Sequence, residues 1–291
     1  LFRKEEIDKE KNVVLKEMDL VNDEPKFYQW ILLQRNLFKN HPAGFPTYGS
    51  RKVIQNLNRE KVLDYYHRYY IPNNMVVSVV GEVKDWKKTI EKEFVLPKGK
   101  TLVREKVGSE LLFNNKVVRE SRDVSNTYMV VGFKSVQRNH PDSPVLEIID
   151  AILGRGQSGK MFTEIRGKKG LAYDVGTEHI SDVNFGYFAV YATIDGKNLE
   201  KVKKLIFEQL NALQKVTEKE IEEAKTFTEG DYYLDLEDNQ RVADQLLFWE
   251  QIKDAQLMNK YIASIKKVTA KDVKRVAEKY FKHYVQVVIG R

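Results

Sequence analysis

Glu10 and Glu17 are the two residues whose spacing best suits joint action on a cation. They stand seven positions apart in segment 3–22, where apolar and charged residues alternate at helical spacing. Seven residues at about 100° each bring both carboxylates to nearly the same face of a helix, two turns apart. Two stacked carboxylates beside apolar neighbours can reach a buried cation. The alternative is two solvated glutamates on a charged helix.

Histidine and cysteine offer no complete catalytic set. The five histidines are His41, His67, His140, His179 and His283. None has a partner four positions away, the spacing that lets two imidazoles of one helix bind one zinc. Cysteine is absent, which excludes disulfides and thiolate sites, and no nucleophile-elbow sequence favours serine hydrolase chemistry. The residues of this chain alone therefore predict no complete zinc centre, and each histidine is expected to be a structural or surface residue.

Composition excludes several classes of protein. The chain has 291 residues, 42% hydrophobic and 31% charged, and no apolar run approaches the roughly 18 residues of a membrane span. The net charge of +7 comes from acids and bases that are interspersed, a pattern typical of solvated helix faces. We therefore expect neither a nucleic-acid partner nor a membrane. A basic RNA-binding or assembly protein is a third hypothesis, which steeply salt-dependent nucleic-acid binding would reveal.

The apolar pattern predicts a mixture of helices and strands without strict alternation, and hence an α+β fold with mixed sheets flanked by helices. Helices are expected at 3–22, 26–38, 59–70, 85–94, 142–153, 159–166, 198–214, 218–249, 251–264 and 270–281. Strands are expected at 75–80, 111–119, 127–133, 171–180, 185–194 and 285–289. The polar segment 96–109 predicts an interdomain linker.

An internal repeat relates the two sides of that linker. Residues 57–62 lead a helix into a strand that ends at Gly81, and 268–273 do the same before Gly290, at offsets of 211 and 209. A weaker match at offset 214 pairs Glu17 with Asp231 and Glu10 with Ala224. The alternative is chance similarity between amphipathic helices. A true repeat of about 210 residues predicts that roughly 115 residues precede Leu1.

Four segments resemble the pitrilysin/insulysin family of zinc metallopeptidases, the inverzincins of the mitochondrial-processing-peptidase type. The segments are Glu10–Glu17 with Asp23-Glu24-Pro25, His41-Pro42 with Gly44 and Gly49, Tyr69-Tyr70-Ile71-Pro72-Asn73-Asn74-Met75 with Val79-Val80-Gly81, and Leu153-Gly154-Arg155-Gly156-Gln157-Ser158 with Arg166 and Gly170-Leu171-Ala172-Tyr173. Their order and spacing carry the resemblance over essentially the whole chain.

The resemblance implies two tandem homologous domains: residues 1–96 as the incomplete C-terminal part of a zinc-binding domain, and 97–291 as a complete, non-catalytic second domain. It implies Zn²⁺, with Glu17 as the anionic ligand and Glu10 as a catalytic carboxylate that handles protons. The two histidines and the general base would lie in an H-x-x-E-H motif roughly sixty residues before Leu1. Arg166 and Tyr173 would bind substrate, although Gly167 stands where relatives often carry an acid.

The resemblance thus predicts an endopeptidase that cleaves peptides inside a closed chamber. The chain would pair with its own upstream segment or with another peptidase-family chain in a homo- or hetero-oligomer, and a cytoplasmic location is favoured. The alternative is a non-catalytic partner subunit that supplies only Arg166 and Tyr173. Retention of Glu10 and Glu17 argues against it.

Overall fold

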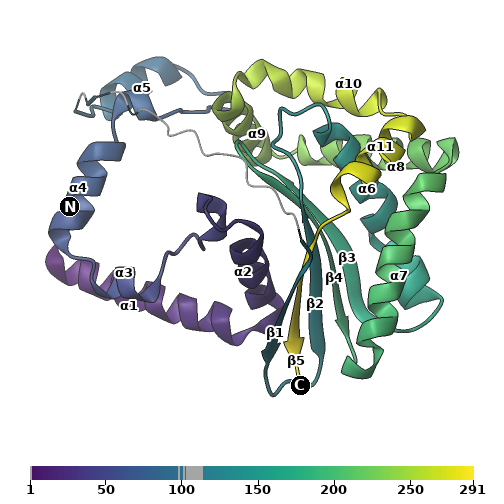
Figure 1. Cartoon of the computed structure of the whole chain (residues 1–291). Coiled ribbons are helices and arrows are strands. Elements are labelled where there is room, and N and C mark those ends of the chain that lie inside the picture. Colours follow the sequence, from purple (N-terminus) through teal and green to yellow (C-terminus); the bar gives the residue numbers. More distant parts are fainter. Residues whose placement is uncertain (1, 98, 101, 103–113) are drawn as a thin grey trace.

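The computed structural model describes residues 2–97, 99–100, 102 and 114–291. The first part of the chain is helical. Its helices are α1 (Lys4–Asp23), α2 (Pro25–Leu37), α3 (Arg51–Gln55), α4 (Arg59–Tyr69) and α5 (Trp86–Glu93). In Figure 1, α1, α3, α4 and α5 form an arc to the left of the sheet, and α2 lies between the arc and the sheet. Among the described helices, none is both long and apolar enough to cross a membrane.

One five-stranded mixed sheet organises the rest of the chain. Its strands are β1 (Lys116–Ser121), β2 (Thr127–Lys134), β3 (Ala172–Ser181), β4 (Gly186–Ile194) and β5 (Val285–Gly290), in the order β1-β5-β2-β4-β3. β1 and β5 pair in parallel, and the other neighbours are antiparallel. The predicted α+β class with a mixed sheet flanked by helices is confirmed.

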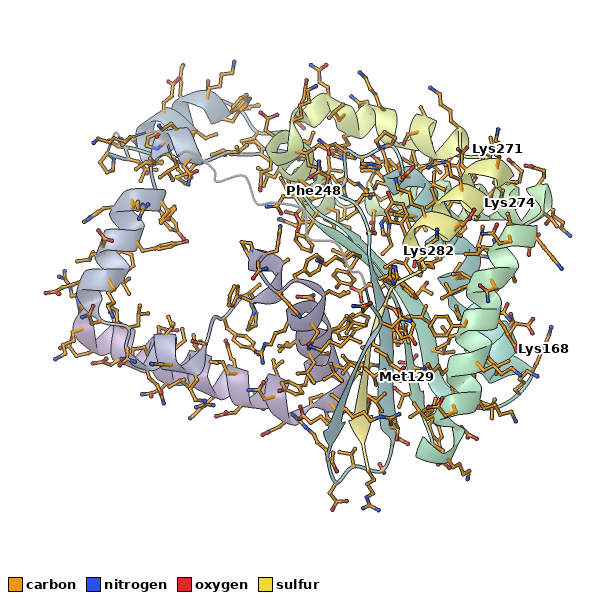
Figure 2. All side chains as sticks on the ribbon, viewed as in Figure 1. Met129, Lys168, Phe248, Lys271, Lys274 and Lys282 are labelled. Carbon is orange, nitrogen blue, oxygen red and sulfur yellow. The ribbon has the colours of Figure 1, made fainter. Side chains whose placement is uncertain are left out.

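Helices cover one face of this sheet (Figure 1). They are α6 (Ser143–Gly154), α7 (Leu199–Ala212), α8 (Glu218–Asp235), α9 (Asn239–Ile252), α10 (Tyr261–Lys266) and α11 (Ala270–Tyr280). Alternate strand residues such as Met129 and Phe188 are fully buried against them, as the period of two in a strand requires. Figure 2 shows Met129 inside the sheet, and Lys168, Lys271 and Lys274 on the outer surface.

Helix α2 covers the opposite face. Leu33 and Leu37 of α2 are buried with Val130 of β2 and Val287 of β5. A Cβ on Gly132 would lie 2.6 Å from Cδ1 of Leu33, so only glycine lets the helix approach this closely. The segment before the predicted linker therefore shares a hydrophobic core with the sheet that follows it.

The predicted strand at 75–80 is wrong for this chain. No strand is present there, and Val76, Val77 and Val79 are 50%, 44% and 40% exposed. A strand needs a neighbour to take its backbone hydrogen bonds. This segment has no strand partner among the described residues, so its β-branched sequence has nothing to pair with.

Two long predicted helices are divided. The 218–249 helix breaks between α8 and α9, because Asp238 caps α9 by accepting hydrogen bonds from the backbone N–H groups of Gln240 (2.7 Å) and Arg241 (3.2 Å). The 251–264 helix becomes the 3₁₀ turn Ala255–Lys260 followed by α10. Residues 98, 101 and 103–109 of the predicted linker, and the start of the predicted strand 111–119, lie outside the described residues.

Candidate functional site

Glu10 and Glu17 share one exposed face of α1. The helix is continuous from Lys4 to Asp23, so the predicted two-turn spacing holds, which is about 10 Å along the axis. Both carboxylates are exposed, and neither forms a hydrogen bond or ion pair with another described residue. Val13 (40% exposed) and Leu20 (71% exposed) lie on the same face. This mixture of free carboxylates and aliphatic side chains is open to a ligand or another protein segment.

Contacts on the other side of α1 fix its rotation. Met18 is 4% exposed, and Nζ of Lys11 donates a hydrogen bond to the backbone oxygen of Leu57 at 2.9 Å. Arg51 at the start of α3 pairs with Asp19. These contacts hold the glutamate face away from α3 and α4, so the two carboxylates stay accessible.

The histidines are dispersed and serve local structure where they are buried. His41 is 5% exposed between the rings of Phe38 and Phe185, and its Nδ1 accepts the Ala43 backbone N–H at 3.0 Å. Nδ1 of His140 accepts the Asp142 backbone N–H at 3.0 Å. His67 and His283 are exposed.

Arg166 lies on an unusual turn. The predicted helix 159–166 ends as a π-helix, Phe162–Gly167, a geometry that is often found at functional sites. Arg166 is exposed, and its Cζ lies 5.1 Å from the centre of the Phe162 ring. The guanidinium is therefore supported by an aromatic face while it remains accessible.

Tyr173 is 63% exposed at an irregularity in β3, where the register shifts between Ala172 and Asp174. It is therefore not a core residue of the strand. The next residue, Asp174, accepts a 3.0 Å bond from Nζ of Lys26 at the start of α2, and this carboxylate raises the pKa of Lys26. That ion pair joins the junction of α1 and α2 to the strand that carries Tyr173.

The structure keeps the two candidate pairs apart. No hydrogen bond or ion pair between described residues links either glutamate to Arg166 or Tyr173. Zinc binds imidazole nitrogen and carboxylate oxygen. No group of three such side chains gathers among the residues the structure describes, although the free carboxylate of Glu17 suits one anionic ligand. The other ligands of a zinc site would have to come from outside the described residues.

A half-buried ionic network around Glu147 of α6 was not predicted from the sequence. Oε2 of Glu147 lies 3.1 Å from Nη1 of Arg138 and 3.3 Å from Nδ1 of His179. Burial alone would raise the pKa of Glu147, but the hydrogen bond from His179 and the charge of Arg138 lower it to about 2. Glu147 and Asp150 are acids among the apolar residues of a predicted helix. Acids in an otherwise apolar helix are the one feature of the sequence that indicates a buried polar site here.

Comparison with known proteins identifies a protein family and relatives of this chain. Residues 56–227 match the model described as the peptidase M16 inactive domain. A Bacillus subtilis (strain 168) protein named uncharacterized zinc protease YmxG is 30% identical over 241 residues, which cover 81% of this chain and 58% of the relative. The chain thus spans less than two thirds of that curated relative.

Solved structures share the fold. A protease from Helicobacter pylori superposes with a TM-score of 0.89 at 22% identity and covers 100% of this chain and 73% of its own. A peptidase M16 inactive domain from Pseudomonas fluorescens gives a TM-score of 0.88 at 20% identity, with coverages of 99% and 71%. Since the family model covers more than half of the residues, the chain belongs to the peptidase M16 family.

Proposed function

We propose that this chain is part of a zinc-dependent endopeptidase that cleaves peptides in a closed chamber. The observation that carries the proposal is the exposed face of α1. There Glu17 and Glu10 present unpaired carboxylates in a chain that belongs to a peptidase family. Retention of both acids argues for this role, because a non-catalytic scaffold has no need of zinc ligands. The relatives named as zinc proteases support zinc as the metal.

In the proposed site, Glu17 would be the anionic ligand of a zinc whose two imidazole ligands come from an upstream segment or a partner chain. Zinc, when bound, supplies the Lewis acidity for peptide-bond hydrolysis. Glu10 lies about 10 Å from Glu17 along the helix, so its role would be to accept or relay protons and not to ligate the same ion. The aliphatic residues on this face would pack against the segment that brings the histidines.

Arg166 and Tyr173 would act on the substrate. Attack on a peptide carbonyl builds negative charge on its oxygen, and a guanidinium and a phenol can stabilise that charge or hold the substrate backbone. Both side chains have the exposure that such contact needs. Since the ligand helix and these residues belong to different parts of the fold, the two parts would have to enclose the peptide together.

A non-catalytic partner subunit is the second candidate. It is favoured by the match of residues 56–227 to an inactive domain, and by the lack of a metal-ligating group among the described residues. In that role the chain would lend Arg166 and Tyr173 to another subunit, and the α1 glutamates would be solvated surface residues.

Zinc content of the complete protein separates the candidates. Glu17→Gln, made in the full-length protein or in the assembly with its partner chain, is expected to lose most bound zinc and activity, because a neutral amide is a poor replacement for an anionic ligand. Glu10→Gln is expected to reduce turnover more than zinc content. Metal content is measured by mass spectrometry and turnover with a quenched peptide.

Glu5→Gln provides the matched control, since Glu5 is an exposed acid on a different face of α1. It is expected to keep zinc and turnover. Full zinc occupancy in the Glu17 variant would remove Glu17 from the ligand set and favour the partner-subunit candidate.

A further inference from the structure

The helices of the structure follow the internal repeat. The first residues of α1 and α8, Lys4 and Glu218, stand 214 positions apart, and so do those of α2 and α9, Pro25 and Asn239. α4 and α11 match over their whole length at offset 211. Equal offsets indicate equivalent elements of two related units. In this comparison α9 is the counterpart of α2, and residues 76–81 are the counterpart of β5 at offset 209.

α2 covers a sheet that belongs, in terms of the repeat, to the other unit. Leu33 of α2 is fully buried against β2 and β5, and a Cβ on Gly132 of β2 would lie only 2.6 Å from it. Val285, Val287 and Ile289, which are alternate residues of β5, belong to the same core. The first unit therefore lends one helix to the sheet of the second.

α9 carries the same apolar position without a sheet beside it. Val242 and Leu246 of α9 pack on the core between the described sheet and its helices. Leu247 and Phe248, the latter labelled in Figure 2, are half-buried and belong to neither hydrophobic core of the described residues. Leu247 is the counterpart of Leu33 at offset 214. The leucine that α2 buries on its sheet is thus kept on α9.

The counterpart of β5 already lies near α9. Residues 78–80 and the first turns of α9 line an open hollow of about 290 Å³. Ser78 and Val80 occupy the positions of two β5 residues that face α2, and both are half-buried. Residues 78–80 and α9 therefore stand in the relation of β5 and α2, but with a hollow between them. Packed protein interiors leave few voids of this size, so the contact is incomplete in this chain.

We infer that α9 is the covering helix of a second sheet, in which 75–80 pairs on both edges with strands of the segment that the repeat places before Leu1. The two units exchange helices: α2 covers the sheet of the second unit, and α9 covers the sheet of the first. This exchange gives Leu247 a core to enter and gives 75–80 its missing strand partners. The existence of the upstream segment rests on the proposed function, but the exchange needs no zinc.

A sheet fits this face better than a lone peptide or a second copy of the chain. Val79 points to the need for burial on the side of 75–80 away from α9, because its counterpart Val288 is 6% exposed in a core. A strand with apolar residues on both faces suits the interior of a sheet that is covered on both sides. The described sheet of a second copy already carries helices on both faces, so it offers α9 no free face.

A cysteine probe on α9 tests the inference, because the chain has no cysteine of its own. Leu247→Cys is prepared in the 291-residue chain and in the full-length protein. Its reaction with a maleimide is followed by mass spectrometry of the peptide that contains residue 247. Labelling is expected to be about tenfold or more slower in the full-length protein, because the upstream sheet covers the thiol. Equal labelling rates in the two proteins overturn the inference.

Leu234→Cys is the matched control. Leu234 is 66% exposed near the end of α8, and its counterpart at offset 214, Leu20, is 71% exposed. Neither unit buries this position, so equal labelling of Leu234→Cys in the two proteins is expected. If both thiols are slowed equally, the protection is not specific to α9 and the inference fails. Phe248→Cys gives the same reading at the next residue, should Leu247→Cys lower the melting temperature.

Hydrogen exchange identifies what covers α9. The backbone amides of 75–80 are expected to exchange about tenfold or more slowly in the full-length protein than in the 291-residue chain, because both edges of the segment become hydrogen-bonded. The amides of β5 should be slow in both proteins. Protection of residue 247 without protection of 75–80 means that another segment covers α9. Protection that requires a partner chain means that the sheet does not come from the upstream segment. Either result overturns the inference.

Neither experiment depends on bound metal. A failed exchange therefore leaves the assignment of Glu17 as a zinc ligand standing, and full zinc occupancy in Glu17→Gln leaves the exchange of helices standing.

Discussion

Acidic residues show how one residue type takes different roles in this molecule. Glu17 lies on an exposed helix face, Glu147 is half-buried in an ionic network, and Asp150 is half-buried with one carboxylate oxygen, Oδ1, that has no hydrogen-bond partner among the described residues. The sequence places Glu10 and Glu17 on one face because helical spacing is local information. It could not give the environment of Glu147 or Asp150, since that depends on how the loop with Arg138 and the strand β3 fold against α6.

Arg166 and Tyr173 are expected to affect turnover without affecting folding, because both side chains are exposed. In the complete enzyme, Arg166→Ala and Tyr173→Phe should each reduce turnover on the order of 10²-fold, as for the loss of one oxyanion donor. Melting temperature and zinc content should stay unchanged. Turnover, calorimetric melting and metal content are measured on the same preparations.

Lys169→Ala and Tyr233→Phe serve as matched controls, since they change an exposed lysine near Arg166 and an exposed tyrosine on α8. Both are expected to retain turnover. Variants of Arg166 and Tyr173 that melt early, yet turn over normally when folded, would make the two residues structural and confine the active site to the zinc-binding part.

At the scale of elements, the clearest difference between sequence and structure concerns one repeated strand. The repeat aligns 75–81 with β5, and both runs are rich in valine. β5 lies between β1 and β2 and is buried throughout, whereas 75–80 forms no strand and is exposed at Val76, Val77 and Val79. Strand formation depends on partners, which a local pattern does not encode.

The other differences between predicted and observed elements arise from features that the apolar pattern does not report. The break between α8 and α9 depends on a cap at Asp238 inside a sequence that otherwise favours helix. The π-helix at Phe162–Gly167 leaves the apolar period almost intact. Helix 270–281 was easier to predict, because Thr269 and Asp272 form a capping box that can be read from the sequence.

Matched substitutions in the repeat test whether 75–80 becomes a strand in a larger assembly. Val79 (40% exposed) and Val288 (6% exposed) are equivalent at offset 209. In this chain, Val79→Lys is expected to change the free energy of unfolding by about 0.5 kcal/mol or less. Val288→Lys should cost several kcal/mol, because it buries a charge. Denaturant unfolding measures both.

In the full-length protein, Val79→Lys is expected to become as costly as Val288→Lys, since added strands would bury Val79. If Val79→Lys stays neutral there, residues 75–80 do not enter a sheet and the repeat does not extend to this strand.

For the whole molecule, the sequence predicted the layers of the fold but not how its two parts share a core. The division at 96/97 follows composition and is still a prediction. Helix α2 belongs to the first part, yet Leu33 and Leu37 pack on the sheet of the second. Such a contact joins α2 to strands that follow it much later in the sequence, and no local pattern reports it.

Residues 97–291 alone are therefore expected to be less stable than the whole chain, because the face under α2 becomes exposed. Leu33→Ala in the whole chain should cost about 2–5 kcal/mol, as for other buried leucines. Leu20→Ala, at a 71% exposed position of α1, should cost little. Thermal unfolding of the four proteins provides the measurement. Equal melting of residues 97–291 and the whole chain would show that α2 contributes nothing to the stability of the sheet.

The place of β5 in the sheet has a consequence for biosynthesis. Among the strands that the structure describes, β5 comes last in sequence, yet it lies between β1 and β2 and is the neighbour that pairs with β1. During translation, α2 and the strands β1 to β4 therefore leave the ribosome before β5 has been synthesised. β5 is the strand that joins β1 to the rest of the described sheet. Until Val285–Gly290 emerge, the nascent chain holds an open strand edge and an uncovered apolar surface. The described sheet can therefore form completely only after these residues have been translated. A chaperone that binds the exposed apolar surface of the nascent chain is expected to raise the yield of folded protein.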